Sequence, residues 1–215
     1  METHLGPASR GFDAIEFFLV IALAFGLSIA GSIVAALSYS YEPVEFGDAA
    51  LWSVLVYEIP AAAVIAFLLH RRGWRWSDFA IHYSRGATIL GVVMAVAVAL
   101  AWLLLELVVG KSPNVPTAGM AAIAAVSVLN PVYEEVLVLG YVVQALRKRF
   151  GLFAAMNVSL AIRLAYHLYQ GPSAVIPIAL FGLVMTLVYV RLGRLWPAIV
   201  AHGLLDFASL SGLID

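Results

Sequence analysis

The sequence contains no cysteine and very little charge. Without cysteine, the chain can form no disulfide, no thiolate metal site and no cysteine nucleophile. Only 12% of its 215 residues are charged, whereas a soluble domain carries about 25%. The net charge of -1 provides no basic field of the kind that attracts nucleic acid, so we expect no nucleic-acid partner.

Hydrophobic residues make up 63% of the sequence, and its mean hydropathy is +0.99. A helix needs about 20 predominantly apolar residues to cross a hydrocarbon core of about 30 Å. Seven segments come close to that length: Ala14–Leu37, Ala49–Leu69, Ala87–Val109, Ala118–Leu146, Leu152–Tyr169, Ala174–Val190 and Leu195–Leu213. We therefore predict an all-α protein, a polytopic transmembrane helix bundle of about seven spans, forming a single integral membrane domain over residues 1–215.

The positive charges lie in alternate connections between these segments. Short cytoplasmic loops of membrane proteins are enriched in Lys and Arg. Ten of the 12 Lys and Arg residues lie on one side of the predicted spans: Arg10, Arg71, Arg72, Arg75, Arg85, Arg147, Lys148, Arg149, Arg191 and Arg194. The pattern predicts a cytoplasmic N-terminus. We expect the helices to contact membrane lipids and the protein to reside in the bacterial inner (cytoplasmic) membrane.

Ionisable side chains at membrane depth are the main candidates for function. There are eight in the predicted spans: Glu58, Glu106, Glu134, Glu135, Arg163, His167, His202 and Asp206. An ionised side chain at the centre of a transmembrane helix costs about 2.5–3.5 kcal/mol, so each needs a partner or a function. We assign structural or interfacial roles to Glu58 and Glu106.

The glutamate pair follows Pro131 in the stretch NPVYEEVLVLGY. A proline removes one helical hydrogen bond and disfavours helical geometry at the preceding residue, so we predict a kinked or broken helix there. Neighbouring helical positions point about 100° apart, so only one of Glu134 and Glu135 should face a common site. Two carboxylates in a low dielectric repel each other, which favours one that can accept a proton near neutral pH.

Two further pairs are spaced four residues apart and therefore share a helix face. His202 and Asp206 form one pair, in which the carboxylate can orient the imidazole, although a buried structural hydrogen bond explains the spacing equally well. Arg163 and His167 form the other. As the one Lys or Arg deep in a predicted span, Arg163 needs an acidic partner, for which Asp206 and the glutamate pair are the candidates.

Three motifs, EEVLVLGY, YHLYQG and LWPAIVAHGLLD, occur in this order between residues 130 and 206. They resemble the CAAX protease and bacteriocin-processing family of intramembrane proteases (CPBP or Abi), which includes type II CAAX prenyl endopeptidases. The predicted helices over residues 118–213 carry these motifs. The resemblance implies a glutamate-dependent endopeptidase without cofactor or metal, acting on a peptide or lipidated peptide through an activated water.

The resemblance also implies residue roles. Glu134 and His167 would activate the water, while His202 and Asp206 would stabilise the oxyanion. We assign supporting roles to Glu135 and Arg163. Carboxylates that accept a proton and hydrogen-bond donors in a low dielectric suit these roles.

Two departures from the family pattern weaken the catalytic prediction. The pattern EExxxR places arginine where this sequence has Leu139, preceded by Val138 in place of an aromatic residue. Arg163 is our candidate to replace that charge. The second departure is Asp206 where asparagine is common: an ionised aspartate cannot donate to an oxyanion, so it is either protonated or orients His202.

These departures leave an alternative open, a catalytically impaired family member that serves as a subunit or scaffold of a membrane protein complex. A cavity at Glu134 and His167, with both side chains within reach of one water, would favour the enzyme. A tightly packed site would favour the scaffold. We rank a zinc hydrolase or a transporter lower, because no HExxH motif and no polar path across both halves of the membrane occur in the sequence.

Overall fold

The computed structural model describes residues 11–38, 46–109 and 117–214, which contain helices and no strands. The all-α prediction is therefore confirmed for this part of the chain. Its α-helices are α1 (Ala14–Leu37), α2 (Asp48–Arg71), α3 (Arg85–Val109), α4 (Met120–Glu135), α5 (Val142–Phe150), α6 (Leu152–His167), α7 (Pro172–Leu192) and α8 (Trp196–Leu210). Two 3-10 turns, η1 (Trp76–Phe79) and η3 (Leu168–Gln170), and the π-helical segment η2 (Val136–Tyr141) complete the set.

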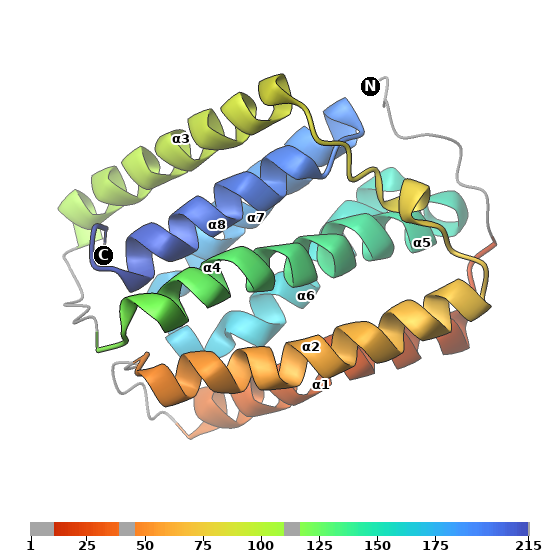
Figure 1. Cartoon of the computed structure of the whole chain (residues 1–215), viewed down its shortest axis with the longest axis horizontal. Coiled ribbons are helices and arrows are strands. Elements are labelled where there is room, and N and C mark those ends of the chain that lie inside the picture. The colour runs from red at the N-terminus through yellow and green to blue at the C-terminus, as the bar shows by residue number, and fades with distance from the viewer. Residues whose placement is uncertain (1–10, 39–45, 110–116, 215) are drawn as a thin grey trace.

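The helices lie side by side in a bundle (Figure 1). In this view α4 and α8 lie in the middle, α3 lies along one side and the pair α1 and α2 along the other, with α6 behind α4. α3 packs on α8, α4 packs on both α8 and α2, and α6 packs on α1, α7 and η2. The three helices that carry the sequence motifs, α4, α6 and α8, therefore meet at the centre of the bundle.

Large apolar side chains cover the outside of the bundle. Leu107, Phe153 and Ile15 are 83%, 81% and 75% exposed, which suits a surface in contact with lipid rather than water. Five helices are long and apolar enough to cross a membrane: Ala14–Leu37, Asp48–Arg71, Arg85–Leu105, Met120–Phe150 and Ala174–Leu192. These helices indicate an integral membrane protein.

The prediction of about seven spans is not confirmed, since five helices of the described residues meet the length and composition of a span. The segments expected at 152–169 and 195–213 are helical, but α6 has 16 residues and α8 has 15. At a rise of 1.5 Å per residue they are about 24 Å and 22 Å long, less than the hydrocarbon core of about 30 Å. α6 ends at His167, where the 3-10 turn η3 follows and stops at Gly171 with a φ of 86°.

Of the kinked or broken helix that we predicted at Pro131, the break does not occur, and the kink stays a prediction. α4 continues through Pro131 to Glu135, although the proline cannot donate to the carbonyl of Ser127. α8 packs tightly over this carbonyl, because a Cβ atom at Gly203 would lie 2.6 Å from it. Packing against neighbouring helices allows membrane helices to retain prolines. The irregular stretch is instead η2, which begins directly after the glutamate pair; π-helical turns often occur at functional sites.

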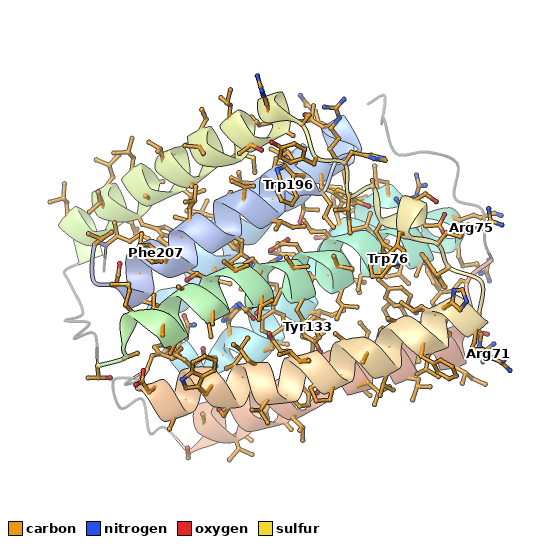
Figure 2. The ribbon with its side chains drawn as sticks, viewed as in Figure 1. Arg71, Arg75, Trp76, Tyr133, Trp196 and Phe207 are labelled. Atoms are coloured by element: carbon orange, nitrogen blue, oxygen red, sulfur yellow. The ribbon has the colours of Figure 1, made fainter. Side chains whose placement is uncertain are left out.

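Positive charges cluster at one end of the bundle. Arg71 and Arg75 lie there with Trp76, near the connection from α2 to α3 (Figure 2). The same end is held together by an ion pair between Arg72 and Asp13, 3.0 Å apart. The arrangement agrees with the alternating loops of the sequence, while the cytoplasmic N-terminus stays a prediction and Arg10 lies outside the described residues.

Candidate functional site

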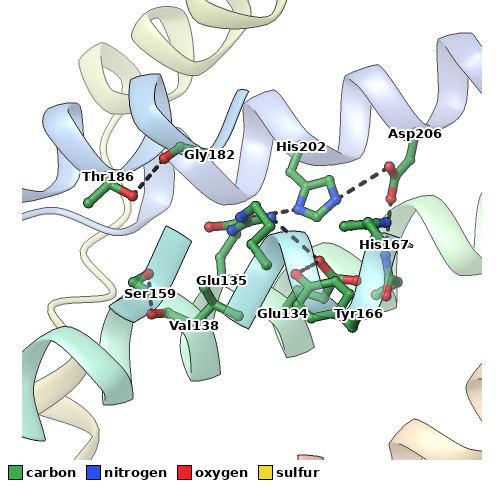
Figure 3. A network of polar contacts seen from close by, with 12 residues as sticks. Glu134, Glu135, Val138, Ser159, Tyr166, His167, Gly182, Thr186, His202 and Asp206 are labelled. Atoms are coloured by element: carbon green, nitrogen blue, oxygen red, sulfur yellow. Dashed lines mark hydrogen bonds and ion pairs between the residues drawn. The ribbon is translucent and has the colours of Figure 1, made fainter. Parts of the chain in front are cut away.

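The glutamate pair at the end of α4 is the starting point of a buried polar network (Figure 3). Glu135 is fully buried, and the side chain of Glu134 retains 10% of its surface exposed. The two side chains use different partners, as expected for neighbouring positions on a helix. The network connects α4 with α6 and α8.

Arg163 of α6 lies between the two glutamates. Its Nη2 atom donates to Oε1 of Glu135 at 2.7 Å, and its Nη1 atom lies 3.5 Å from Oε2 of Glu134. The guanidinium is 1% exposed and lies over the ring of Phe181, 4.9 Å from its centroid. A Cβ atom at Gly182 would lie 3.0 Å from Cδ of Arg163, so glycine at this position of α7 provides the space for the arginine.

Glu134 receives a second contact from α6. The hydroxyl of Tyr166 donates to Oε2 of Glu134 at 2.5 Å, so both polar partners of Glu134 contact the same oxygen. Stacking on Phe25 fixes the tyrosine ring, with centroids 4.8 Å apart, and Ser32 of α1 donates to its backbone carbonyl at 2.8 Å. Oε1 of Glu134 has no hydrogen-bond partner among the described residues.

His202 of α8 lies between two carboxylates. Its Nδ1 atom lies 2.7 Å from Oε1 of Glu135, and its Nε2 atom lies 3.4 Å from Oδ1 of Asp206. Asn130 of α4 donates to the other oxygen of Asp206 at 3.2 Å. An imidazole can donate to both carboxylates only when both nitrogens carry a proton, so this geometry favours a positively charged His202. It also favours the alternative in which Asp206 orients His202.

His167 lies beside this network. Its Nδ1 atom is 3.2 Å from Nε2 of Gln170, and its ring centroid is 4.5 Å from that of Tyr166. Because the Gln170 amide is a donor, Nδ1 accepts and the proton of a neutral ring is on Nε2. His167 makes no hydrogen bond to Glu134.

A cavity of about 590 Å³ lies between α2, η1, α4 and η2. Apolar side chains such as Ile65 and Leu137 form most of its lining, and it extends to Tyr133, the residue before Glu134. Neither Glu134 nor His167 lines it. This cavity therefore does not open at Glu134 and His167, where a cavity would favour an enzyme.

A family model described as type II CAAX prenyl endopeptidase Rce1-like matches residues 116–208. This stretch, which is less than half of the chain, is similar to that family, and we call residues 116–208 the Rce1-like segment. The match confirms the resemblance predicted from the three motifs. No curated protein and no solved structure matches the chain.

The Rce1-like segment contains every site residue that the sequence suggested, and the structure brings five of the six into one chain of contacts. Figure 3 shows the path from Asp206 through His202 to the glutamates and Tyr166. The position where the family pattern has arginine, Leu139, is buried and apolar, and the guanidinium beside the glutamates comes from Arg163 instead. This proximity is what our replacement hypothesis requires, and the catalytic roles stay predictions.

Three residues of the Rce1-like segment were missed by the sequence analysis. They are Asn130, Tyr166 and Gln170, which bind Asp206, Glu134 and His167. Asn130 precedes Glu134 by one helical turn, so a signal for it existed in the spacing. Tyr166 belongs to the motif YHLYQG, but its contact with Glu134 depends on how α6 packs against α4.

The described residues contain no group of three or more His, Asp or Glu side chains arranged to hold a metal ion. The absence of a metal and of a cofactor remains a prediction.

Proposed function

We propose that this protein is an intramembrane endopeptidase of the CAAX-protease type that hydrolyses a peptide or lipidated peptide with a water activated by Glu134. The observation that carries the proposal is the asymmetry of the glutamate pair. Glu135 is fully buried and bound by both Arg163 and His202. Glu134 is held through Oε2 alone, which leaves Oε1 available to take a proton.

In the proposed reaction, Oε1 of Glu134 removes a proton from water. The water oxygen then forms a bond to the carbonyl carbon of the substrate, and the carbonyl π electrons move onto the carbonyl oxygen. When this electron pair returns, the bond between carbon and nitrogen breaks, and the amine leaves with the proton from Glu134. Tyr166 and Arg163 keep the carboxylate oriented through contacts with Oε2.

The two histidines complete the proposed site. His167, with its proton on Nε2, assists in positioning the water beside Glu134. His202 stabilises the oxyanion through its positive charge, which Glu135 and Asp206 hold in place. A preorganised charge of this kind in a low dielectric is a strong source of transition-state stabilisation.

The test compares membranes from cells that contain the wild-type protein or the Glu134→Gln variant. Val128→Ala is the matched control, because Val128 is on the same helix and 63% exposed on its outer face. We expect peptide profiling to find cleavage products with wild type and control that disappear with Glu134→Gln. Unchanged products in the Glu134→Gln membranes would refute the proposal.

The same membranes test the scaffold alternative, which is supported by the apolar Leu139 in place of the family arginine and by a cavity that reaches neither Glu134 nor His167. Affinity purification of wild type and Glu134→Gln shows whether stable partner subunits are bound. Partners retained in both, with no change in any cleavage product, would establish the scaffold function instead of the enzyme.

A further inference from the structure

The cavity between α2 and α4 lies toward the end of the bundle where the positive charges cluster. Both helices run toward this end (Figure 1). Near their beginnings they pack together, with Leu51 and Leu55 of α2 in one apolar cluster with Ile123 and Val126 of α4. Further along both helices, the cavity of about 590 Å³ lies between them and is completed by η1 and η2. We call this cavity the α2–α4 groove.

The α2–α4 groove has a buried floor and an exposed rim. Ile65 of α2 and Leu137 of η2 line it and are buried. Phe67, Trp76 and Val132 also line it and are 63%, 71% and 41% exposed. The groove therefore opens on the outer surface of the bundle, which is covered by apolar side chains and faces lipid. Its volume falls within the about 300–1,000 Å³ of ordinary ligand sites.

One end of the groove carries positive charge beside an aromatic ring. His70 and Arg75 line it together with Trp76, and Figure 2 shows Arg75 and Trp76 at the basic end of the bundle with Arg71. Among the described residues, no carboxylate forms an ion pair with Arg75. The nearby carboxylate of Asp78 accepts a hydrogen bond from the backbone amide of Arg75 at 2.7 Å. The guanidinium of Arg75 is therefore available to an anion at the end of the groove.

This combination matches the two parts of an anionic phospholipid. In a membrane, an apolar groove that opens toward lipid is filled by hydrocarbon, because acyl chains are as apolar as the leucine side chains that line it. Basic pockets between transmembrane helices bind anionic headgroups, and tryptophan rings lie at the level of the headgroups. The substrate of the proposed reaction fits less well, because neither Glu134 nor His167 lines the groove.

We propose that the α2–α4 groove is a binding site for an anionic phospholipid. An acyl chain lies in the groove over Ile65 and Leu137, and the phosphate lies beside Arg75 and Trp76. The bound lipid connects α2 and η1 with α4 and η2, across the part of the bundle where α2 and α4 do not fill the space between them. This inference goes beyond the proposed function and does not depend on it.

The test measures lipid binding to the purified full-length protein in detergent micelles by native mass spectrometry. The probe is dioleoyl phosphatidylglycerol, and dioleoyl phosphatidylcholine, with the same chains and no net charge, is the control lipid. We expect the wild-type protein to bind one phosphatidylglycerol about fivefold more tightly than phosphatidylcholine, the factor for one basic residue beside an anionic lipid.

Two pairs of variants locate the site. Ala66→Trp places a large side chain in the groove and should abolish binding of phosphatidylglycerol, while Ala63→Trp, on the same helix, exposed and outside the groove, should not. Arg75→Gln should weaken the binding about fivefold, while Arg85→Gln, an exposed residue outside the groove at the start of α3, should leave it unchanged. Because Arg75 is exposed, its replacement tests the headgroup contact without changing the packing of the helices.

Three results would overturn the inference. The first is equal binding of the two lipids by the wild-type protein. The second is the same affinity for phosphatidylglycerol in Ala66→Trp as in Ala63→Trp. The third is displacement of phosphatidylglycerol from the wild-type protein by a peptide that carries an isoprenylated cysteine, because the groove would then bind the substrate of the proposed reaction.

Discussion

Replacing Arg163 by methionine should destabilise the protein strongly. At an effective dielectric constant of about 20, its contacts of 2.7 Å to Glu135 and 3.5 Å to Glu134 correspond to gross attractions of about 6 and about 5 kcal/mol. Burial of the charges opposes most of this attraction. The free energy of unfolding should therefore fall by about 3–5 kcal/mol, the typical cost of leaving partner carboxylates buried without their counter-ion.

The free energy of unfolding is measured in detergent micelles by denaturant titration, followed by circular dichroism. The double variant Arg163→Met, Glu135→Gln should recover part of the loss, because it removes the carboxylate that the single variant leaves unpaired. We expect an interaction energy of at least about 1 kcal/mol between the two sites. Additive losses, or an Arg163→Met variant as stable as wild type, would refute the assignment of Arg163 as the counter-ion of the pair.

Two further predictions concern residues around this pair. Tyr166→Phe removes the hydroxyl that donates to Glu134 at 2.5 Å. It should lower the free energy of unfolding by about 1.5–3 kcal/mol, the usual range for a hydrogen bond to a charged group. An unchanged free energy of unfolding in denaturant titration would mean that this bond is not made. Gly182→Val should lower the unfolding temperature, because even its Cβ atom would lie 3.0 Å from Cδ of Arg163. Gly26→Ala should not lower it, because the nearest atom to the added Cβ is 3.9 Å away. Equal effects of the two substitutions in thermal unfolding would contradict close packing at Gly182.

The long helices could be predicted because membrane spans leave a simple signal in the sequence. Runs of apolar residues predicted α1, α2, α3 and α7 as spans, and all seven predicted segments contain helix in the structure. The lengths of α6 and α8 were overestimated, because their apolar runs continue past the helix ends. In α6 the last turn is 3-10 rather than α, which depends on Gly171 and local packing.

The polar network was predictable in part, from the cost of isolated charges in a membrane. Arg163 needed an acid, and the structure pairs it with the glutamates named as candidates. The π-helical turn after Glu135 left no recognisable signal, since VLVLGY is compatible with an ordinary helix. The path of α4 through Pro131 depends on contacts with α8, which the sequence of α4 does not contain.

Glu58 shows a signal that was present but not used. Its spacing of seven residues from Leu51 and three from Leu55 places it on the same buried face of α2 as these two leucines. From the sequence we assigned it a structural or interfacial role. A helix periodicity applied to charged as well as apolar residues would have placed it in the interior.

The most direct test of the central claim follows the origin of the oxygen in the product. Purified wild-type protein and Glu134→Gln in nanodiscs are incubated with the isoprenylated peptide in water labelled with heavy oxygen, and the products are analysed by mass spectrometry. We predict that wild type places one labelled oxygen in the new carboxyl terminus and that Glu134→Gln forms no such product. Labelled product at the wild-type rate from Glu134→Gln would contradict the claim that Glu134 activates the water.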